Sequence, residues 1–258
     1  MEYNRNNNLD NTHNQFNKEC DSIDLMSFKT NKLMKSIVQN CCYSNGMSHK
    51  NFIETNYKNV IKSIDFDLLR KIDAIGGSGD EQLINGLSPK VYSYIKEALL
   101  YYSVYLKPKK IYEINNLLII GGGYGMEAVI LYHVLKTLNI KINSITGIDM
   151  PSVAELQNFF FKACNLEQIC KTYDENYIEK NIDLVYSNCC LAELNEKTNY
   201  KYYNDYISKS RGFYIIWGLW CADIPEYYKE YENTRIDKLL NEGLYDKHAK
   251  RVNCLFLK

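Results

Sequence analysis

From about residue 116 onward, short apolar runs alternate with segments of helical periodicity. The runs typical of strands buried on both faces of a sheet are 116–120, 144–148, 182–188 and 212–217, with a weaker one at 169–173. The intervening helical patterns cover 126–138, 152–164, 200–209 and 225–240, and a last strand is expected at 252–257. Alternating strands and helices predict an α/β fold with a doubly wound, parallel sheet.

The chain before residue 110 has a helical pattern without strands. Between residues 22 and 45 a weak amphipathic pattern predicts one short helix, and a stronger pattern over 53–72 predicts a long one. Ser88-Pro89 then opens a helix that continues to about residue 108, with Ser88 as its N-cap.

These patterns divide the chain into three parts. Residues 1–20 are rich in asparagine and poor in apolar residues, which predicts a disordered tail. Residues 21–110 form a predicted N-terminal helical cap, and residues 111–258 form the α/β core. We expect residues 53–107 of this cap to close over the carboxyl edge of the sheet and to shape the acceptor pocket, because a small acceptor needs walls that the core alone does not provide. Because the tail has no apolar face to bury, its removal should leave folding intact.

Composition and charge limit the functions open to the chain. Its 258 residues carry 31 basic and 31 acidic side chains, so no overall charge attracts nucleic acid or an anionic membrane. No apolar run approaches the roughly 20 residues that a membrane helix needs. Nine cysteines without CxxC spacing predict reduced thiols in a cytoplasmic protein, and four histidines without an HExxH motif predict no metal site.

A glycine-rich turn follows the first core strand. Gly121, Gly123 and Gly125 stand directly after residues 116–120, where ligands of open α/β sheets bind, and glycines let a ligand approach the backbone. A dinucleotide-binding turn would need a third glycine where this chain has Met126. The GxGxG spacing is instead the pattern of class I methyltransferases. A tight strand-to-helix turn without a ligand is the alternative interpretation.

Polar residues end the next strands at the same edge. Asp149 directly follows residues 144–148. Its distance along the chain from Gly125, the last glycine of the turn, is close to the offset of about 20 residues at which an acid meets ribose hydroxyls in nucleoside-binding α/β folds. A carboxylate can accept hydrogen bonds from both vicinal hydroxyls. The alternative is an acid in the turn before the helix over 152–164, which Ser152 is expected to open as a capping box. Ser187 and Asn188 end the strand over 182–188.

Together these segments resemble the sugar O-methyltransferase family over about residues 70–218. Three segments carry the resemblance: Ile120-Gly121-Gly122-Gly123-Tyr124-Gly125, then Asp149-Met150-Pro151 with Leu156-Gln157, and Ser187-Asn188 with Glu193-Leu194. The resemblance implies a Rossmann-like class I methyltransferase that uses S-adenosylmethionine and transfers a methyl group to a hydroxyl of a sugar or nucleotide-sugar. The residues it implies for cofactor binding are Gly121, Gly122, Gly123, Tyr124, Gly125, Asp149, Met150 and Asn188.

The resemblance also has implications for the chemistry. The family has a glutamate where this chain has Ile119, and related methyltransferases use that acid to meet the methionine ammonium, so Asn188 or a backbone carbonyl is expected to replace it. Glu193 matches the acid of the family's SEL segment and is the candidate general base. A solvated acid at a helix start is the alternative, with Asp223 as the next base to test.

The sequence leaves other roles open as well. The pair Trp217 and Trp220, together with Tyr124, are candidate aromatic walls of the site, although core packing is an equal alternative for Trp217. Two further functions also fit: methylation of another small molecule at O or N, and a catalytically silent methyltransferase-fold protein that binds a partner.

Overall fold

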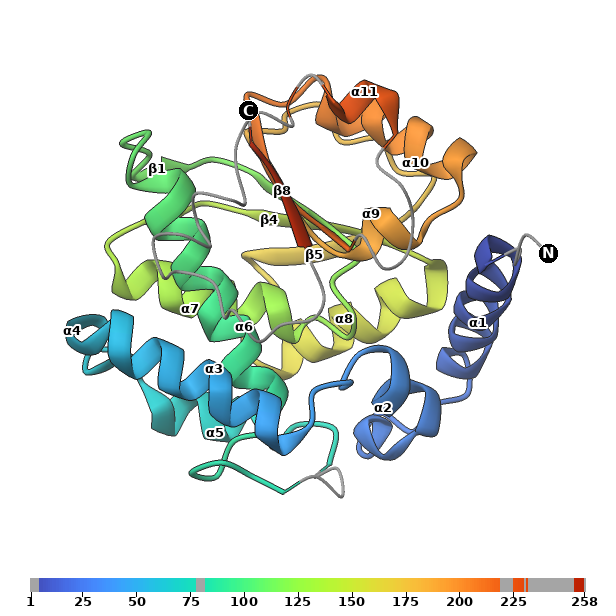
Figure 1. Cartoon of the computed structure of the whole chain (residues 1–258). Coiled ribbons are helices and arrows are strands. Elements are labelled where there is room, and N and C mark those ends of the chain that lie inside the picture. Colours follow the sequence, from blue (N-terminus) through green and yellow to red (C-terminus); the bar gives the residue numbers. More distant parts are fainter. Residues whose placement is uncertain (1–4, 78–81, 219–224, 230, 232–252, 258) are drawn as a thin grey trace.

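A six-stranded sheet forms the centre of the computed structural model, which describes residues 5–77, 82–218, 225–229, 231 and 253–257 (Figure 1). The strands are β2 (Leu117–Ile120), β4 (Ile145–Asp149), β5 (Cys170–Asp174), β6 (Leu184–Asn188), β7 (Gly212–Gly218) and β8 (Asn253–Leu257). Their order in the sheet is β5-β4-β2-β6-β7-β8, and only the pairing of β7 with β8 is antiparallel. This arrangement confirms the predicted doubly wound sheet.

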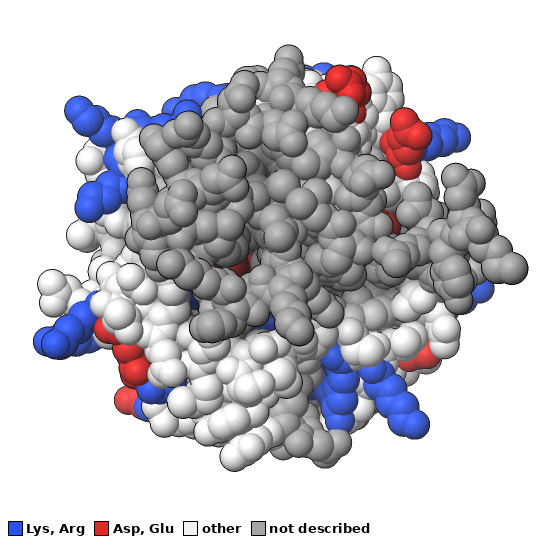
Figure 2. Space-filling view, in the orientation of Figure 1, with Lys and Arg blue, Asp and Glu red and all other residues white. Residues whose placement is uncertain are grey.

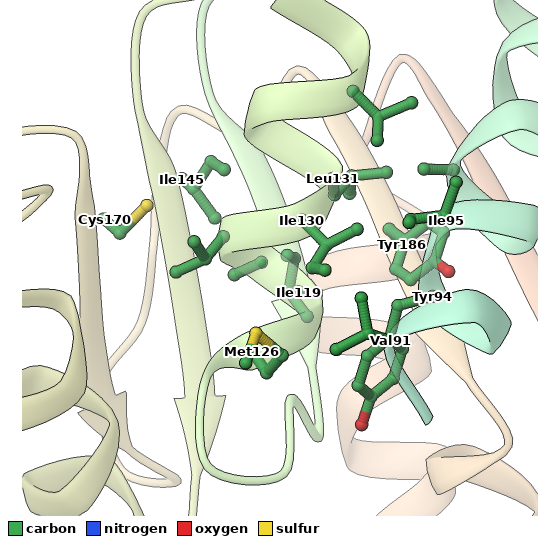
Figure 3. Packing of buried hydrophobic residues seen from close by; sticks show 14 of the residues in the cluster. Val91, Tyr94, Ile95, Ile119, Met126, Ile130, Leu131, Ile145, Cys170 and Tyr186 are labelled. Atoms are coloured by element: carbon green, nitrogen blue, oxygen red, sulfur yellow. The ribbon is translucent and has the colours of Figure 1, made fainter. Parts of the chain in front are cut away.

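Helices cover both faces of the sheet, which explains why the strands are continuous apolar runs. On one face, α6 (Pro89–Leu100) and α7 (Met126–Thr137) pack over side chains such as Ile119 and Tyr186 (Figure 3). On the same face, α8 (Pro151–Ala163) packs over β4 and β5. On the other face lie α9 (Cys190–Glu193), α10 (Glu196–Tyr202), η3 (Tyr203–Ile207) and α11 (Glu226–Lys229). A small parallel ladder joins β1 (Glu113–Ile114) to β3 (Lys141–Ile142).

The N-terminal cap has more and shorter helices than its pattern predicts. Its elements are η1 (Phe28–Thr30), α2 (Lys32–Ile37), α3 (Tyr43–Asn56), α4 (Lys58–Ile61), α5 (Phe66–Asp73), and η2 (Tyr101–Leu106), which continues α6. The predicted single helix over 53–72 is wrong. Asp65 starts a new helix there because its carboxylate accepts a hydrogen bond from the Leu68 amide at 2.9 Å. The single helix expected between 22 and 45 is likewise divided.

The predicted disordered tail is also wrong, because its described residues form α1 (Arg5–Cys20). Phe16 is 3% exposed, and α1 packs along α8. The Asn17 side-chain oxygen accepts a hydrogen bond from the Ser152 amide at 3.0 Å, and the Ser152 hydroxyl donates to Asp21. Ser152 is thus no N-cap. The segment folds because the amides in the first turn of α8 need hydrogen-bond acceptors, and the Asn17 side chain of α1 provides one. The composition of residues 1–20 alone does not reveal this interaction.

Some predictions for the C-terminal third fall on residues that the structure does not describe. Of the helix expected over 225–240, the structure describes Glu226–Lys229. The candidate site residues Trp220 and Asp223 lie outside the described residues. Among the described helices, none has the length and apolar character to cross a membrane. Figure 2 shows acidic and basic side chains interspersed around the visible face, in keeping with the balanced charge.

Candidate functional site

A pocket of about 1010 Å³ opens at the carboxyl ends of β2, β4 and β6. The strand order reverses between β2 and β6, and such a reversal is where open α/β sheets bind ligands. The core supplies one side of the pocket through Gly121, Gly123, Asp149, Met150 and Asn188. Helices α1, α3 and α6 supply the other side. The lining residues of α6 fall within 53–107, the part of the cap expected to close over this edge, whereas those of α3 precede residue 53 and α1 precedes the cap.

The glycine turn brings its backbone to the pocket because side chains are absent there. Gly121 and Gly123 line the pocket with φ values of 73° and 58°, in the left-handed region that favours glycine. A Cβ atom at Gly121 would lie 2.2 Å from the Cys190 sulfur. Gly125 instead packs under Phe161 and precedes α7, and Gly122 is buried. The turn thus serves two purposes: an open backbone at the pocket and a close contact between α7 and α8.

Asp149 is held in position by hydrogen bonds to both of its carboxylate oxygens. Its Oδ1 accepts from the Met150 amide at 2.9 Å, and its Oδ2 accepts from Gln157 Nε2 at 2.8 Å. The same Gln157 nitrogen donates to the Gly123 carbonyl at 2.8 Å, and Thr172 donates to Gln157 Oε1 at 2.6 Å. Gln157 therefore fixes Asp149 relative to the glycine turn. Burial raises the pKa of Asp149 to about 6, so the carboxylate is mainly ionised at neutral pH.

Glu127 is a pocket residue that sequence reasoning missed. It lies in the first turn of α7, is 5% exposed and lines the pocket. Its Oε1 accepts hydrogen bonds from Asn188 Nδ2 at 2.7 Å and from the Tyr186 hydroxyl at 3.1 Å. Burial raises the pKa of Glu127 to about 7. The signal was present in the sequence, because Glu127 is the one acid in the otherwise apolar stretch 126–131.

Glu193 reaches the same pocket from α9. Its Oε2 lies 3.3 Å from Nε2 of His13, and the two side chains are 23% and 20% exposed. His13 comes from α1, the segment expected to be disordered. The imidazole also lies close enough to Asp149 to lower the pKa of that carboxyl against the larger effect of burial. Helix α1 therefore places a titratable group between two acids of the pocket.

The cap contributes a polar wall opposite the glycine turn. Its hydrogen-bonding side chains on α3 and α6 are Asn45, Ser48, His49, Lys90, Ser93 and Glu97. Glu97 is 7% exposed, with Oε1 3.1 Å from Lys96 Nζ and with no hydrogen bond to Oε2 in the described part of the chain. Helical periodicity located these residues on a cap but could not show which of them faced the sheet.

Two aromatic candidates point into the core instead of the pocket. Tyr124 is 1% exposed, with its ring centroid 5.1 Å from that of Phe28 and 5.2 Å from that of Phe160. Its side chain therefore cannot act as the expected cofactor wall. Trp217 is also buried and packs against Tyr228 on the opposite face of the sheet. In the described residues, no group of three His, Cys, Asp or Glu side chains is placed to hold a metal ion.

Comparison with known proteins gives likenesses of fold only. No protein family and no curated protein matches the chain in sequence. Among solved structures, mitomycin 7-O-methyltransferase MmcR is 13% identical, with a TM-score of 0.43 over 66% of this chain and 54% of its own. Thermoplasma acidophilum 1320 is 12% identical, with a TM-score of 0.42 over 75% of this chain and 95% of its own. The N-terminal domain of EvdMO1, solved with SAH and D-fucose, is 14% identical, with a TM-score of 0.38 over 55% and 54%.

These comparisons leave the function to be argued from the site. The chain spans about half the length of the mitomycin enzyme that it resembles. TM-scores below 0.5 at these identities carry no inference about substrate or cofactor. The strand order, the glycine turn and the groups around the pocket are the observations from which a function can be derived.

Proposed function

We propose that the protein is an S-adenosylmethionine-dependent methyltransferase that acts on a hydroxyl of a sugar or nucleotide-sugar. One observation carries the cofactor assignment: Gln157 bridges Asp149 to the Gly123 carbonyl, so the acid and the glycine turn form one rigid wall of the pocket. The bridge fixes the Asp149 carboxylate, which suits a ribose diol, next to the glycine backbone, which a ligand can approach closely. Both lie at the carboxyl edge of the sheet, where open α/β sheets bind ligands.

The residues of the pocket fit such a cofactor. Asp149 offers carboxylate oxygens to the ribose hydroxyls, and Met150 offers an apolar side chain next to it. Gly121 and Gly123 leave room for the chain that joins the nucleoside to the amino acid. The cofactor supplies a methyl group on a sulfonium, which needs no further activation. The contribution of the protein is to hold an acceptor in line with the carbon–sulfur bond and to keep water away.

The acceptor side of the proposal concerns the cap and α9. The hydrogen-bonding groups of α3 and α6 suit an acceptor rich in hydroxyls, and Glu193 is our candidate to take the hydroxyl proton. His13, 3.3 Å away, would position the Glu193 carboxylate toward the pocket. A reducing, cytoplasmic compartment also belongs to the proposal. Seven cysteines are free thiols in the structure: Cys20, Cys41, Cys42, Cys164, Cys170, Cys189 and Cys190.

Calorimetric titration with S-adenosylhomocysteine tests the cofactor assignment. We expect Asp149→Ala to weaken binding by about 1.5–3 kcal/mol, the usual size for hydrogen bonds to a charged group. Asp174→Ala is the matched control, because Asp174 ends β5 in register with Asp149 but does not line the pocket. Unchanged affinity in Asp149→Ala would remove the ribose assignment. Tight binding of NAD without any response to the methyl donor would overturn the proposed function as a whole.

A further inference from the structure

We infer that Glu127, together with Asn188, forms a subsite for the ammonium group of the cofactor's amino-acid end. This inference rests on the proposed function and deepens it, because it assigns a specific carboxylate to a specific part of the ligand. The sequence led us to expect Asn188 or a backbone carbonyl to make this contact. The structure adds a buried acid from a different element, α7, at the same place.

The position of Glu127 follows from the glycine turn and the sheet register. Helix α7 begins directly after Gly125, so its first turn returns over the end of β2. In the sheet, Ile119 of β2 pairs with Tyr186 of β6. The Tyr186 hydroxyl donates to Glu127 Oε1 at 3.1 Å, so the carboxylate lies on the sheet face occupied by this pair. Glu127 therefore supplies a negative charge on the sheet face that Ile119 and Tyr186 share, where the apolar Ile119 supplies none.

The hydrogen bonds of Glu127 leave part of the carboxylate for a ligand. Both Asn188 and Tyr186 donate to Oε1, and within the described chain no group donates to Oε2. Glu127 nevertheless lines the pocket. Two donors on one oxygen fix the orientation of the carboxylate, while the second oxygen remains an acceptor. The amide oxygen of Asn188, whose nitrogen is already used, is a further acceptor for an ammonium donor.

Glu127 has no ion-pair partner within the described residues. Lys90 of α6 is engaged by Asn40 at 3.3 Å and lies over the Tyr94 ring. A carboxylate that is 5% exposed and unpaired is costly, and a cationic ligand group would remove that cost.

The charges around Glu127 define what a pH experiment would measure. The titratable and charged groups of the neighbouring elements that influence it or are influenced by it are Lys90, Tyr94 and Glu97 of α6, Tyr186 of β6, and Cys189 and Cys190 after β6. Burial raises the pKa of both tyrosines and both thiols, which keeps these four groups neutral near pH 7. Lys90 opposes the effect of burial on Glu127, and Glu97 adds to it.

The chemistry of the ligand follows from the two acids of the core wall. Asp149 ends β4, and Glu127 lies in the first turn of α7, the helix that follows β2. The two adjacent strands therefore each bring one carboxylate to the pocket, with the glycine turn beside them. One carboxylate suits a diol and the other suits a cation. S-Adenosylmethionine and S-adenosylhomocysteine carry both groups, separated by the chain that passes the glycines. 5′-Methylthioadenosine carries the diol but lacks the amino-acid end, and is therefore the natural comparison ligand.

Calorimetric titration of the full chain with S-adenosylhomocysteine and with 5′-methylthioadenosine tests the subsite. At pH 8 we expect Glu127→Gln to weaken binding of the first ligand by about 10- to 100-fold and to leave binding of the second unchanged within about 2-fold. Asp174→Asn is the control, because it removes a carboxylate that ends β5, in register with Asp149, and that does not line the pocket. We expect it to change neither affinity by more than about 3-fold.

The outcomes distinguish a failure of the Glu127 subsite alone from a failure of the proposed function. Equal losses for both ligands in Glu127→Gln would mean a structural role and would overturn the subsite, as would unchanged affinity for both. Equal effects of Glu127→Gln and Asp174→Asn on affinity for the first ligand would mean that loss of any nearby negative charge weakens binding, and would overturn the direct contact. Failure of the wild type to bind either ligand would overturn the proposed function and the subsite together.

Discussion

The raised pKa of Glu127 predicts a stability difference that needs no ligand. In the folded protein the pKa of Glu127 is about 7, against an ordinary value of 4.5. A folded-state pKa above the unfolded value means that the folded protein binds the proton more tightly. The stability that this proton contributes is present at low pH and is lost as the pH rises from about 4.5 through about 7. The perturbation to make is Glu127→Gln.

The size of the effect follows from the same shift. At about 1.4 kcal/mol for each pKa unit, full ionisation of Glu127 costs the folded state on the order of 3 kcal/mol. Glutamine has the shape of the neutral acid, and its carbonyl oxygen can accept the hydrogen bonds from Asn188 and Tyr186. We therefore expect the variant and the wild type to be about equally stable at pH 4.5. At pH 8 the variant should be more stable by about 2–3 kcal/mol.

Urea denaturation at several pH values between 4.5 and 8 measures this difference. The difference in free energy of unfolding between Glu127→Gln and the wild type isolates the effect of Glu127. The raised pKa of Asp149 is present in both proteins and therefore cancels. Glu155→Gln, on the exposed side of α8, is the control and should follow the wild type at every pH. Parallel stability curves for Glu127→Gln and the wild type would show that Glu127 is not a desolvated acid and would refute the reasoning.

Two further predictions concern the proton acceptor and the N-terminal helix. We expect Glu193→Gln to keep the affinity for S-adenosylhomocysteine but to lower methyl transfer to a nucleotide-sugar by about 10²-fold or more, measured with a labelled methyl donor. Turnover equal to that of the wild type would restrict Glu193 to hydrogen bonding and make Asp223 the next base to test. We expect Phe16→Ala to lower the free energy of unfolding by about 2–4 kcal/mol, because a buried aromatic ring leaves a cavity. A variant as stable as the wild type would mean that α1 contributes little to the fold, as the composition of the segment first indicated.

The sequence by itself determined the core of the protein. Apolar runs such as Leu117–Ile120 placed the strands, and the intervals between them placed α7 and α8, because a sheet buried on both faces leaves a strong local pattern. The glycine turn and Asp149 were located for a related reason. The carboxyl ends of parallel strands share one edge, so residues far apart in the chain can be assigned to one site from their place after each strand.

Only the tertiary structure decided which other residues complete the pocket. Helix α1 is stable because Asn17 and Phe16 dock on α8, and no local pattern carries that information. Tyr124 stands in the middle of the glycine turn, yet its ring turns into the core, since a ring next to Phe28 and Phe160 leaves water. Glu127 reads in the sequence as one acid on an apolar helix. Its hydrogen bonds to β6 make it part of the site, because the packing of α7 on the sheet determines which way that helix turn faces.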